Sequence, residues 1–80
     1  MFHTYILRCS DDTLYVGSTS DLTRRIHQHN NAKSGAHYTK IRRPVTIVHT
    51  ESFRTLAKAR AREAELKRLT RSEKLAILEA

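Results

Sequence analysis

The sequence predicts an α/β protein of the α+β kind. Its expected architecture is a small three-stranded, mainly antiparallel sheet flanked by helices, in the order β-β-α-β-α-α. Two apolar segments near the N-terminus are separated by a polar turn, and a third follows a proline. Three other stretches repeat apolar residues at helical spacing. Because a helix and a sheet must each bury an apolar side, packing the helices on the sheet is the economical arrangement.

The first two strands are expected to form a hairpin. Residues 3–9 are typical of a strand, residues 10–12 (Ser-Asp-Asp) turn the chain, and residues 14–17 form the returning strand. Both segments carry apolar side chains at odd and even positions. Both faces of the sheet are therefore expected to be covered.

A helix is predicted directly after the hairpin. Ser20 is its expected N-cap, and Asp21 favours the positive end of the helix dipole. Leu22 and Ile26 form an apolar stripe with the spacing of one helical turn. The helix should end near residues 30–31.

The second half of the chain contains the third strand and two more helices. Pro44 should open the strand at residues 45–49, where its missing N–H does least harm. A long helix is expected over about residues 55–69. The segment Thr70-Arg-Ser-Glu73 is a capping box that begins a last helix.

Composition narrows the class of protein. Eighty residues suffice for one domain, expected to span 1–80, and an apolar content of 39% suits a globular chain. The single cysteine, Cys9, allows neither a disulfide framework nor a cysteine-based zinc site. No apolar run approaches the roughly 20 residues of a membrane span, and the N-terminus lacks the pattern of a signal peptide. A cytoplasmic protein with no membrane partner is therefore expected.

The charge balance favours a polyanionic partner. Fifteen Lys and Arg against eight Asp and Glu give a net charge of +7, which favours nucleic acid or an acidic surface. A basic loop is expected at residues 32–43, and the alternative is an ordinary solvated loop. Its candidate nucleic-acid contacts are Lys33, His37, Tyr38, Lys40, Arg42 and Arg43.

Two polar residues of the first helix lie on the side that should face the sheet. Positions 22, 25, 26 and 29 share one face of a helix. Leu22 and Ile26 make this face the inward one, so Arg25 and His29 should also point toward the sheet.

The long helix repeats this pattern with an acidic residue. Leu56, Ala59 and Leu66 define its inward sector, and Glu63 falls inside that sector. A charge placed toward the sheet must form an ion pair or take part in catalysis or binding, because the burial of a lone charge costs several kcal/mol.

A purely structural alternative remains open for these charges. An Arg25–Glu63 salt bridge would fix one helix on the other, and Arg62 is also placed to pair with Glu63. The other cations of the last two helices, Lys67 among them, are interpreted as a solvated surface, and the alternative is that they extend a DNA-binding face.

Four short motifs follow one another at a characteristic spacing. The chain has His3-Thr4-Tyr5, then Tyr15-Val16-Gly17, then Arg-Arg-Ile-His-Gln-His-Asn at residues 24–30, and finally a helix containing Glu63. This order resembles the GIY-YIG nuclease family, and the end of the chain looks like the small stand-alone bacterial members. Known members act in excision repair, Holliday-junction resolution, intron homing and restriction.

The resemblance implies a nuclease with one Mg²⁺ or Mn²⁺ on Glu63, acting on DNA in preference to RNA. Arg25 would stabilise the phosphate, and Tyr15 would take the proton from the attacking water. Tyr5 would orient that water or share the proton transfer, and His29 resembles a second base or proton relay. This scheme requires both tyrosines on one face of the sheet, and hence an odd-length turn or a bulge between the strands.

The chain departs from the family pattern at three points. His3 replaces the first glycine, and Ser18 stands where some repair members carry a functional lysine. The late asparagine of many members is missing beyond Asn31, so its role is either absent or filled from the loop, for example by Thr39. Two alternatives to a nuclease are a nucleic-acid-binding domain with little or no turnover and an interaction module that needs a protein partner.

Overall fold

One antiparallel sheet with the strand order β2-β1-β3 forms the centre of the computed structural model, which describes residues 1–31, 39 and 41–79. The predicted fold class and element order are confirmed. The elements are β1 (Phe2–Arg8), β2 (Leu14–Thr19), α1 (Leu22–Asn31), β3 (Thr46–Phe53), α3 (Leu56–Arg68) and α4 (Arg71–Glu79).

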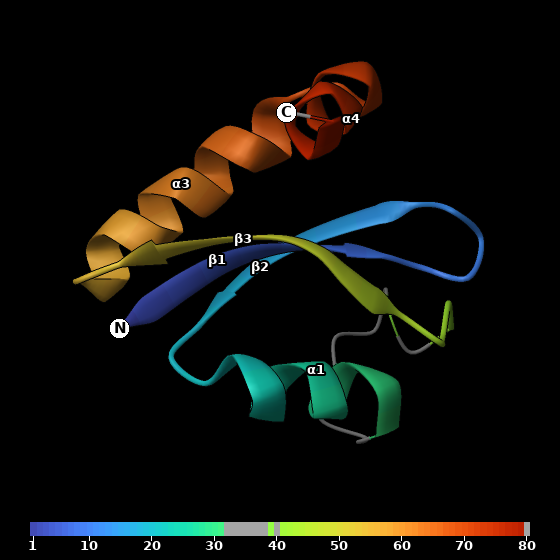
Figure 1. Cartoon of the computed structure of the whole chain (residues 1–80), viewed down its shortest axis with the longest axis horizontal. Coiled ribbons are helices and arrows are strands. Elements are labelled where there is room, and N and C mark those ends of the chain that lie inside the picture. The colour runs from blue at the N-terminus through green and yellow to red at the C-terminus, as the bar shows by residue number, and fades with distance from the viewer. Residues whose placement is uncertain (32–38, 40, 80) are drawn as a thin grey trace.

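Helices cover both faces of the sheet, as the apolar pattern of the strands predicts. Helix α1 lies against one face, and α3 and α4 lie on the other (Figure 1). On the α1 side, Tyr5 and Leu7 of β1 pack with Leu22 and Ile26. On the other side, the core includes Ile6, Val16 and Leu66, together with partly buried apolar residues of α4.

The hairpin turn places both tyrosines on the same face. Tyr5 pairs with Gly17, and Leu7 pairs with Tyr15. Residues 10–12 form a three-residue loop closed by a backbone hydrogen bond from the N–H of Cys9 to the carbonyl of Thr13, 2.9 Å long. The odd-length turn required by the sequence is therefore present.

The first helix begins one residue later than its predicted cap implies. The N–H of Arg24 donates to Oδ1 of Asp21 at 3.1 Å, so Asp21 is the N-cap and the prediction of Ser20 is wrong. The reason lies in the preceding turn. The N–H of Asp21 donates to Oγ1 of Thr19, which folds the chain so that Ser20 is left exposed.

Strand β3 and helix α4 compare differently with their predictions. The strand continues to Phe53 instead of ending near His49, because its polar second half still pairs with the first residues of β1.

The capping box of α4 is confirmed. The N–H of Thr70 donates to Oε1 of Glu73 at 2.9 Å, and the N–H of Glu73 donates to Oγ1 of Thr70 at 3.2 Å.

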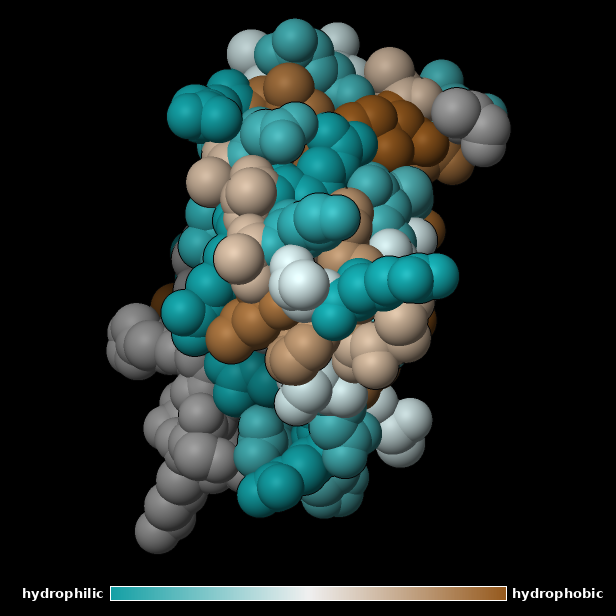
Figure 2. Space-filling model, turned by 90° about the vertical axis from the view of Figure 1, so that its left-hand side faces the viewer, coloured by the Kyte–Doolittle hydropathy of each residue, from teal (hydrophilic) through white to brown (hydrophobic). Residues whose placement is uncertain are grey.

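One end of the sheet presents a largely polar surface. Figure 2 shows a mostly hydrophilic face at the end of the sheet where β1 begins and where β2 and β3 end. None of the helices in the described part of the chain is long and apolar enough to cross a membrane.

Candidate functional site

The ring of Tyr5 reaches toward the edge of the sheet because Gly17 has no side chain. Tyr5 lies on the central strand and is buried. A Cβ atom on Gly17 would stand 2.5 Å from the Tyr5 hydroxyl and 2.6 Å from its Cζ. Since β2 is an edge strand, the glycine lets the phenol pass over β2 toward the border of the sheet.

His29 of α1 links Tyr5 to residue 39. Its Nε2 is hydrogen-bonded to the Tyr5 hydroxyl at 2.9 Å, and its Nδ1 to Oγ1 of Thr39 at 2.8 Å. The ring of Tyr15 meets the His29 ring edge-on, with centroids 5.1 Å apart. His29 and Thr39 are both fully buried. Thr39, which the sequence offered for the missing asparagine, therefore lies beside the predicted site.

Burial keeps both members of the Tyr5–His29 pair neutral at pH 7. Desolvation, against the opposing effect of Arg25, raises the pKa of Tyr5 to about 12. Desolvation and the charges of Arg25 and Arg43 lower the pKa of His29 to about 4. A neutral imidazole has one donor and one acceptor nitrogen, so the protons of the Tyr5–His29–Thr39 chain can be ordered in either direction.

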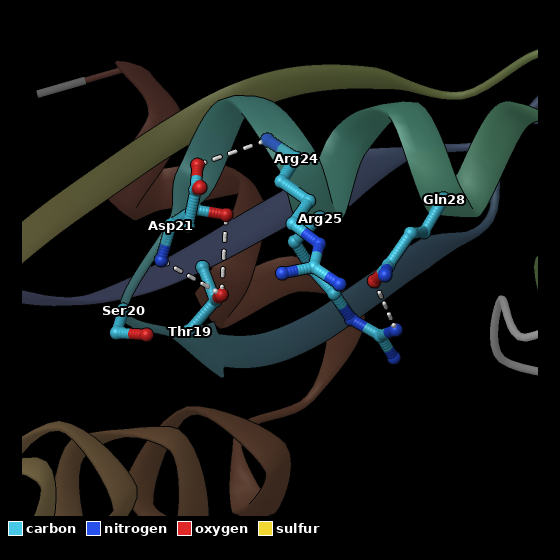
Figure 3. Close-up of a pocket in the computed structure, with 6 residues that line it drawn as sticks. All are labelled: Thr19, Ser20, Asp21, Arg24, Arg25 and Gln28. Carbon is cyan, nitrogen blue, oxygen red and sulfur yellow. Dashed lines mark hydrogen bonds between the residues drawn. The ribbon is translucent and has the colours of Figure 1, made fainter.

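Arg25 approaches the tyrosines from α1 at the border of a polar pocket. Its Nη1 donates to Oε1 of Gln28 at 3.1 Å, and its charge lowers the pKa of Tyr5 against the larger effect of burial. Figure 3 shows Arg24 and Arg25 leaving the same side of the helix with their guanidinium groups in this pocket. The pocket has a volume of about 190 Å³ and is lined by Thr19, Ser20, Asp21, Arg24, Arg25 and Gln28.

Glu63 arrives from α3, on the opposite face of the sheet. Oγ of Ser18 donates to its Oε1 at 2.6 Å, and Nζ of Lys67 lies 2.7 Å from its Oε2. The side chain is 20% exposed, so it is partly open to solvent but not turned out into it. Burial alone would raise the pKa of the Glu63 carboxyl. Hydrogen bonds from Lys67 and Ser18 outweigh burial and hold this pKa below its usual value.

The structural alternatives proposed for Glu63 are wrong. The guanidinium of Arg62 pairs with Glu51 at 3.0 Å and with Glu65 at 3.3 Å, because its position on α3 directs it to β3 and along the helix. Within the described residues, no ion pair joins Arg25 to Glu63, since Arg25 is directed to Gln28 and Tyr5 on the other side of the sheet.

Two residues that contact Glu63 were missed as partners by the sequence analysis. Lys67 was interpreted as solvated surface, although its spacing of four residues from Glu63 is that of a helical ion pair. Ser18 was noted only as a replacement for a lysine. Its place on β2, two residues after the inward Val16, directs its hydroxyl to the α3 side.

The predicted site residues lie on both faces of the sheet, next to strands β1 and β2. On the α1 side, the His29 ring contacts the rings of Tyr5 and Tyr15, and Arg25 lowers the pKa of Tyr5 against the larger effect of burial. On the other side, Glu63 is joined to β2 through the hydroxyl of Ser18.

The candidate nucleic-acid contacts are only partly described. Lys33, His37, Tyr38 and Lys40 lie outside the described residues. The guanidinium of Arg42 pairs with Asp11 at 3.0 Å. Arg43 donates to the backbone carbonyls of Gln28 and His29 at the C-terminal end of α1. A cation is favourable there, because this end of the helix dipole is negative. Both arginines therefore also have structural partners.

The chemistry of Glu63 fits a single hard cation. In the described part of the chain, no three His, Cys, Asp or Glu side chains gather at a common point. Mg²⁺ keeps several of its waters and is commonly held by one or two carboxylates and a substrate phosphate. Glu63 already accommodates a positive group, the Lys67 ammonium, against Oε2. One partly exposed carboxylate of this kind suits Mg²⁺ or Mn²⁺.

Comparisons with known proteins agree with the resemblance in the motifs. The model of the GIY-YIG catalytic domain matches residues 1–76. A UPF0213 protein of Syntrophus aciditrophicus is 47% identical over 76 residues, covering 95% of this chain and 87% of that protein. One from Halobacterium salinarum is 48% identical over 77 residues, covering 96% and 99%. The solution NMR structure of a UPF0213 protein from Bacillus halodurans has a TM-score of 0.63 and 38% identity, covering 99% and 84%.

Proposed function

The chain belongs to the GIY-YIG family, and from this premise we propose that it is a metal-dependent nuclease that hydrolyses phosphodiester bonds, in DNA rather than RNA. The observation that carries the proposal is the contact of His29 with Tyr5 and Tyr15 beside Arg25, together with the hydrogen bond of Glu63 to Ser18, which lies on the same strand as Tyr15. These residues come from four elements, and packing alone does not require all of them to be polar.

Glu63 is the proposed ligand of one Mg²⁺ or Mn²⁺. Its lowered pKa keeps the carboxylate ionised at neutral pH, as a hard metal ligand must be. The hydrogen bond from Ser18 fixes the orientation of Oε1. When bound, the cation supplies charge that polarises a phosphoryl oxygen and stabilises the leaving alkoxide.

Arg25 is proposed to hold the phosphate as negative charge accumulates on it. A guanidinium is always charged and presents a planar set of donors that matches phosphate geometry. Its hydrogen bond to Gln28 limits the positions it can adopt. Binding of this kind stabilises the transition state more when the arginine is oriented in advance.

The two tyrosines are proposed to have different roles. Tyr15 is half-buried at the sheet edge and is the proposed general base for the attacking water. Tyr5 is fully enclosed, and burial raises its pKa to about 12, so it suits orientation of the water better than proton transfer. His29 holds Tyr5 through Nε2 and is itself held by Thr39. These two hydrogen bonds fix the orientation of the neutral Tyr5 and His29 side chains.

Nuclease assays with a matched pair of variants test the proposal. The purified protein is incubated with plasmid DNA, branched DNA, single-stranded DNA or RNA. Each incubation is run with Mg²⁺ or Mn²⁺ and is repeated with EDTA. Glu63→Gln should abolish cleavage while binding of DNA persists. Glu65→Gln is the control, since Glu65 lies on the same helix with an exposed side chain. Cleavage that survives Glu63→Gln or EDTA would overturn the assignment.

One observation favours a second function, a nucleic-acid-binding domain with little turnover. Both carboxylate oxygens of Glu63 have protein partners, Ser18 and Lys67. A carboxylate held permanently in this way would bind no metal. Binding of DNA by the wild type without cleavage in either metal would establish this function in place of the nuclease.

A further inference from the structure

The two oxygens of Glu63 are bound by donors of different character. Oε1 accepts from the hydroxyl of Ser18 on the strand, and Oε2 faces the ammonium of Lys67 one turn further along α3. The serine contact is neutral and comes from a backbone held in the sheet. The lysine contact is ionic and comes from a flexible side chain that is 54% exposed.

This exposure makes the lysine contact easy to open. Ion pairs on the surface of a helix contribute little to stability, because water screens them and ordering two long side chains costs entropy. A divalent cation on the same carboxylate carries twice the charge of an ammonium. The ammonium and the metal would compete for one oxygen, and two cations so close together repel each other.

Once displaced, the Lys67 ammonium would still lie at the same edge of the sheet. Lys67 is 2.7 Å from Glu63, which is hydrogen-bonded to Ser18 on the same strand as Tyr15. A lysine beside Glu63 would therefore also lie beside a phosphate held by a metal on that carboxylate. Lysine is a common phosphate ligand, and its long side chain allows it to change partners.

We propose that Lys67 is an exchangeable counter-ion of Glu63, which a divalent metal displaces and which then binds a phosphate of the nucleic acid. This inference rests on the metal site of the proposed function. Ser18 keeps its hydrogen bond in both states and preserves the orientation of the carboxylate. The proposed metal ligand is thus kept neutralised until a metal binds, and Lys67 then becomes available to bind a phosphate.

Binding of Mn²⁺ alone tests the first half of this inference. Isothermal titration calorimetry compares the wild type with Lys67→Met and with Lys58→Met, which removes the same charge from an exposed position on the same helix. Lys67→Met should bind Mn²⁺ about two- to fivefold more tightly than Lys58→Met, the range expected for an exposed ion pair. Lys67→Arg, which can keep the ion pair, should stay close to the wild type.

Binding of a short single-stranded phosphorothioate oligonucleotide tests the second half. With Mn²⁺, Lys67→Met should weaken binding and reduce the slope of log K against log salt concentration by about 0.7, the value of one phosphate contact. With EDTA, Lys67→Met and Lys58→Met should behave alike.

The outcomes separate this inference from the proposed function. Equal Mn²⁺ affinity of Lys67→Met and Lys58→Met would overturn the counter-ion role while leaving the metal site intact. An equal oligonucleotide effect with and without metal would overturn the exchange. If neither the wild type nor Lys67→Met binds Mn²⁺, the metal-dependent function and this inference both fail. Melting curves confirm that each variant is folded.

Discussion

The hydroxyl of Tyr5 occupies the space that a side chain on Gly17 would fill. A Cβ atom at position 17 would lie 2.5 Å from this hydroxyl, whereas real Cβ atoms essentially never approach a neighbour more closely than 3.0 Å. The glycine of the second strand motif therefore has a steric function. It provides the path by which a buried ring on the central strand reaches the site at the sheet edge.

Gly17→Ala should destabilise the protein and displace Tyr5. The phenol cannot yield freely, because its hydroxyl is hydrogen-bonded to the buried His29. We expect a loss of about 1 to 3 kcal/mol in the free energy of unfolding, as for other overpacked cores. Urea unfolding followed by circular dichroism measures it. In a Tyr5→Leu background the same alanine should cost much less, and an equal cost in both backgrounds would contradict the steric explanation.

The two tyrosines should respond differently to the loss of their hydroxyls. Tyr5→Phe leaves the buried Nε2 of His29 without its partner, which should cost about 1 to 3 kcal/mol in stability. Tyr15→Phe should change stability less, since Tyr15 is half-buried, and should lower the cleavage rate by about 10²- to 10⁴-fold as the loss of a general base. Single-turnover rates and urea unfolding on both variants check this. If Tyr5→Phe reduces the rate more than Tyr15→Phe, the assigned roles are reversed.

Much of the fold was predictable because local signals and tertiary packing agree. Apolar residues at odd and even strand positions predicted helices on both faces, and the capping box at Thr70 predicted the start of α4. The prediction of Ser20 as an N-cap was wrong, because two adjacent residues have capping side chains. The hydrogen bond between Thr19 and Asp21 selects between them, and helix periodicity carries no information about it.

For the site, the inward direction of Arg25, His29 and Glu63 followed from helical spacing. Their partners did not, because these depend on which face of the sheet each helix covers. Arg25 and Glu63 lie on opposite sides, so both point inward without forming a pair. The contact of His29 with Thr39 joins residues ten positions apart in the sequence, and helix periodicity carries no information about it.

Arg25→Lys should distinguish the contribution of positive charge to phosphate binding from that of guanidinium geometry. The lysine keeps the positive charge but loses the planar fork and the hydrogen bond to Gln28. We expect the single-turnover cleavage rate at saturating DNA to fall by about 10²- to 10³-fold, as when an oriented transition-state donor is lost. Arg24→Lys is the matched control, because Arg24 lines the same pocket but is exposed. Equal effects of the two substitutions would indicate a general need for charge near α1.

The buried imidazole of His29 should make folding sensitive to mild acid. Burial and the charges of Arg25 and Arg43 lower its pKa to about 4 in the folded protein, from 6.5 in the unfolded chain. Between these values the unfolded state binds more protons, so the free energy of unfolding falls as the pH decreases from 6.5 toward 4. The expected loss is on the order of 2 kcal/mol. Urea unfolding at several pH values, followed by circular dichroism because the chain has no tryptophan, measures it.

A variant that lacks only the His29 imidazole isolates this effect from that of the carboxylates. Glu51 and Glu63 have lowered pKa values in the folded state, so their contribution to stability is present above pH 4.5 and is lost only as the pH falls below it. His29→Gln keeps one donor and one acceptor but does not titrate. Its unfolding free energy should therefore change less than that of the wild type between pH 6.5 and 5. Parallel pH profiles of the two proteins over this interval would show that His29 is not held neutral by the fold.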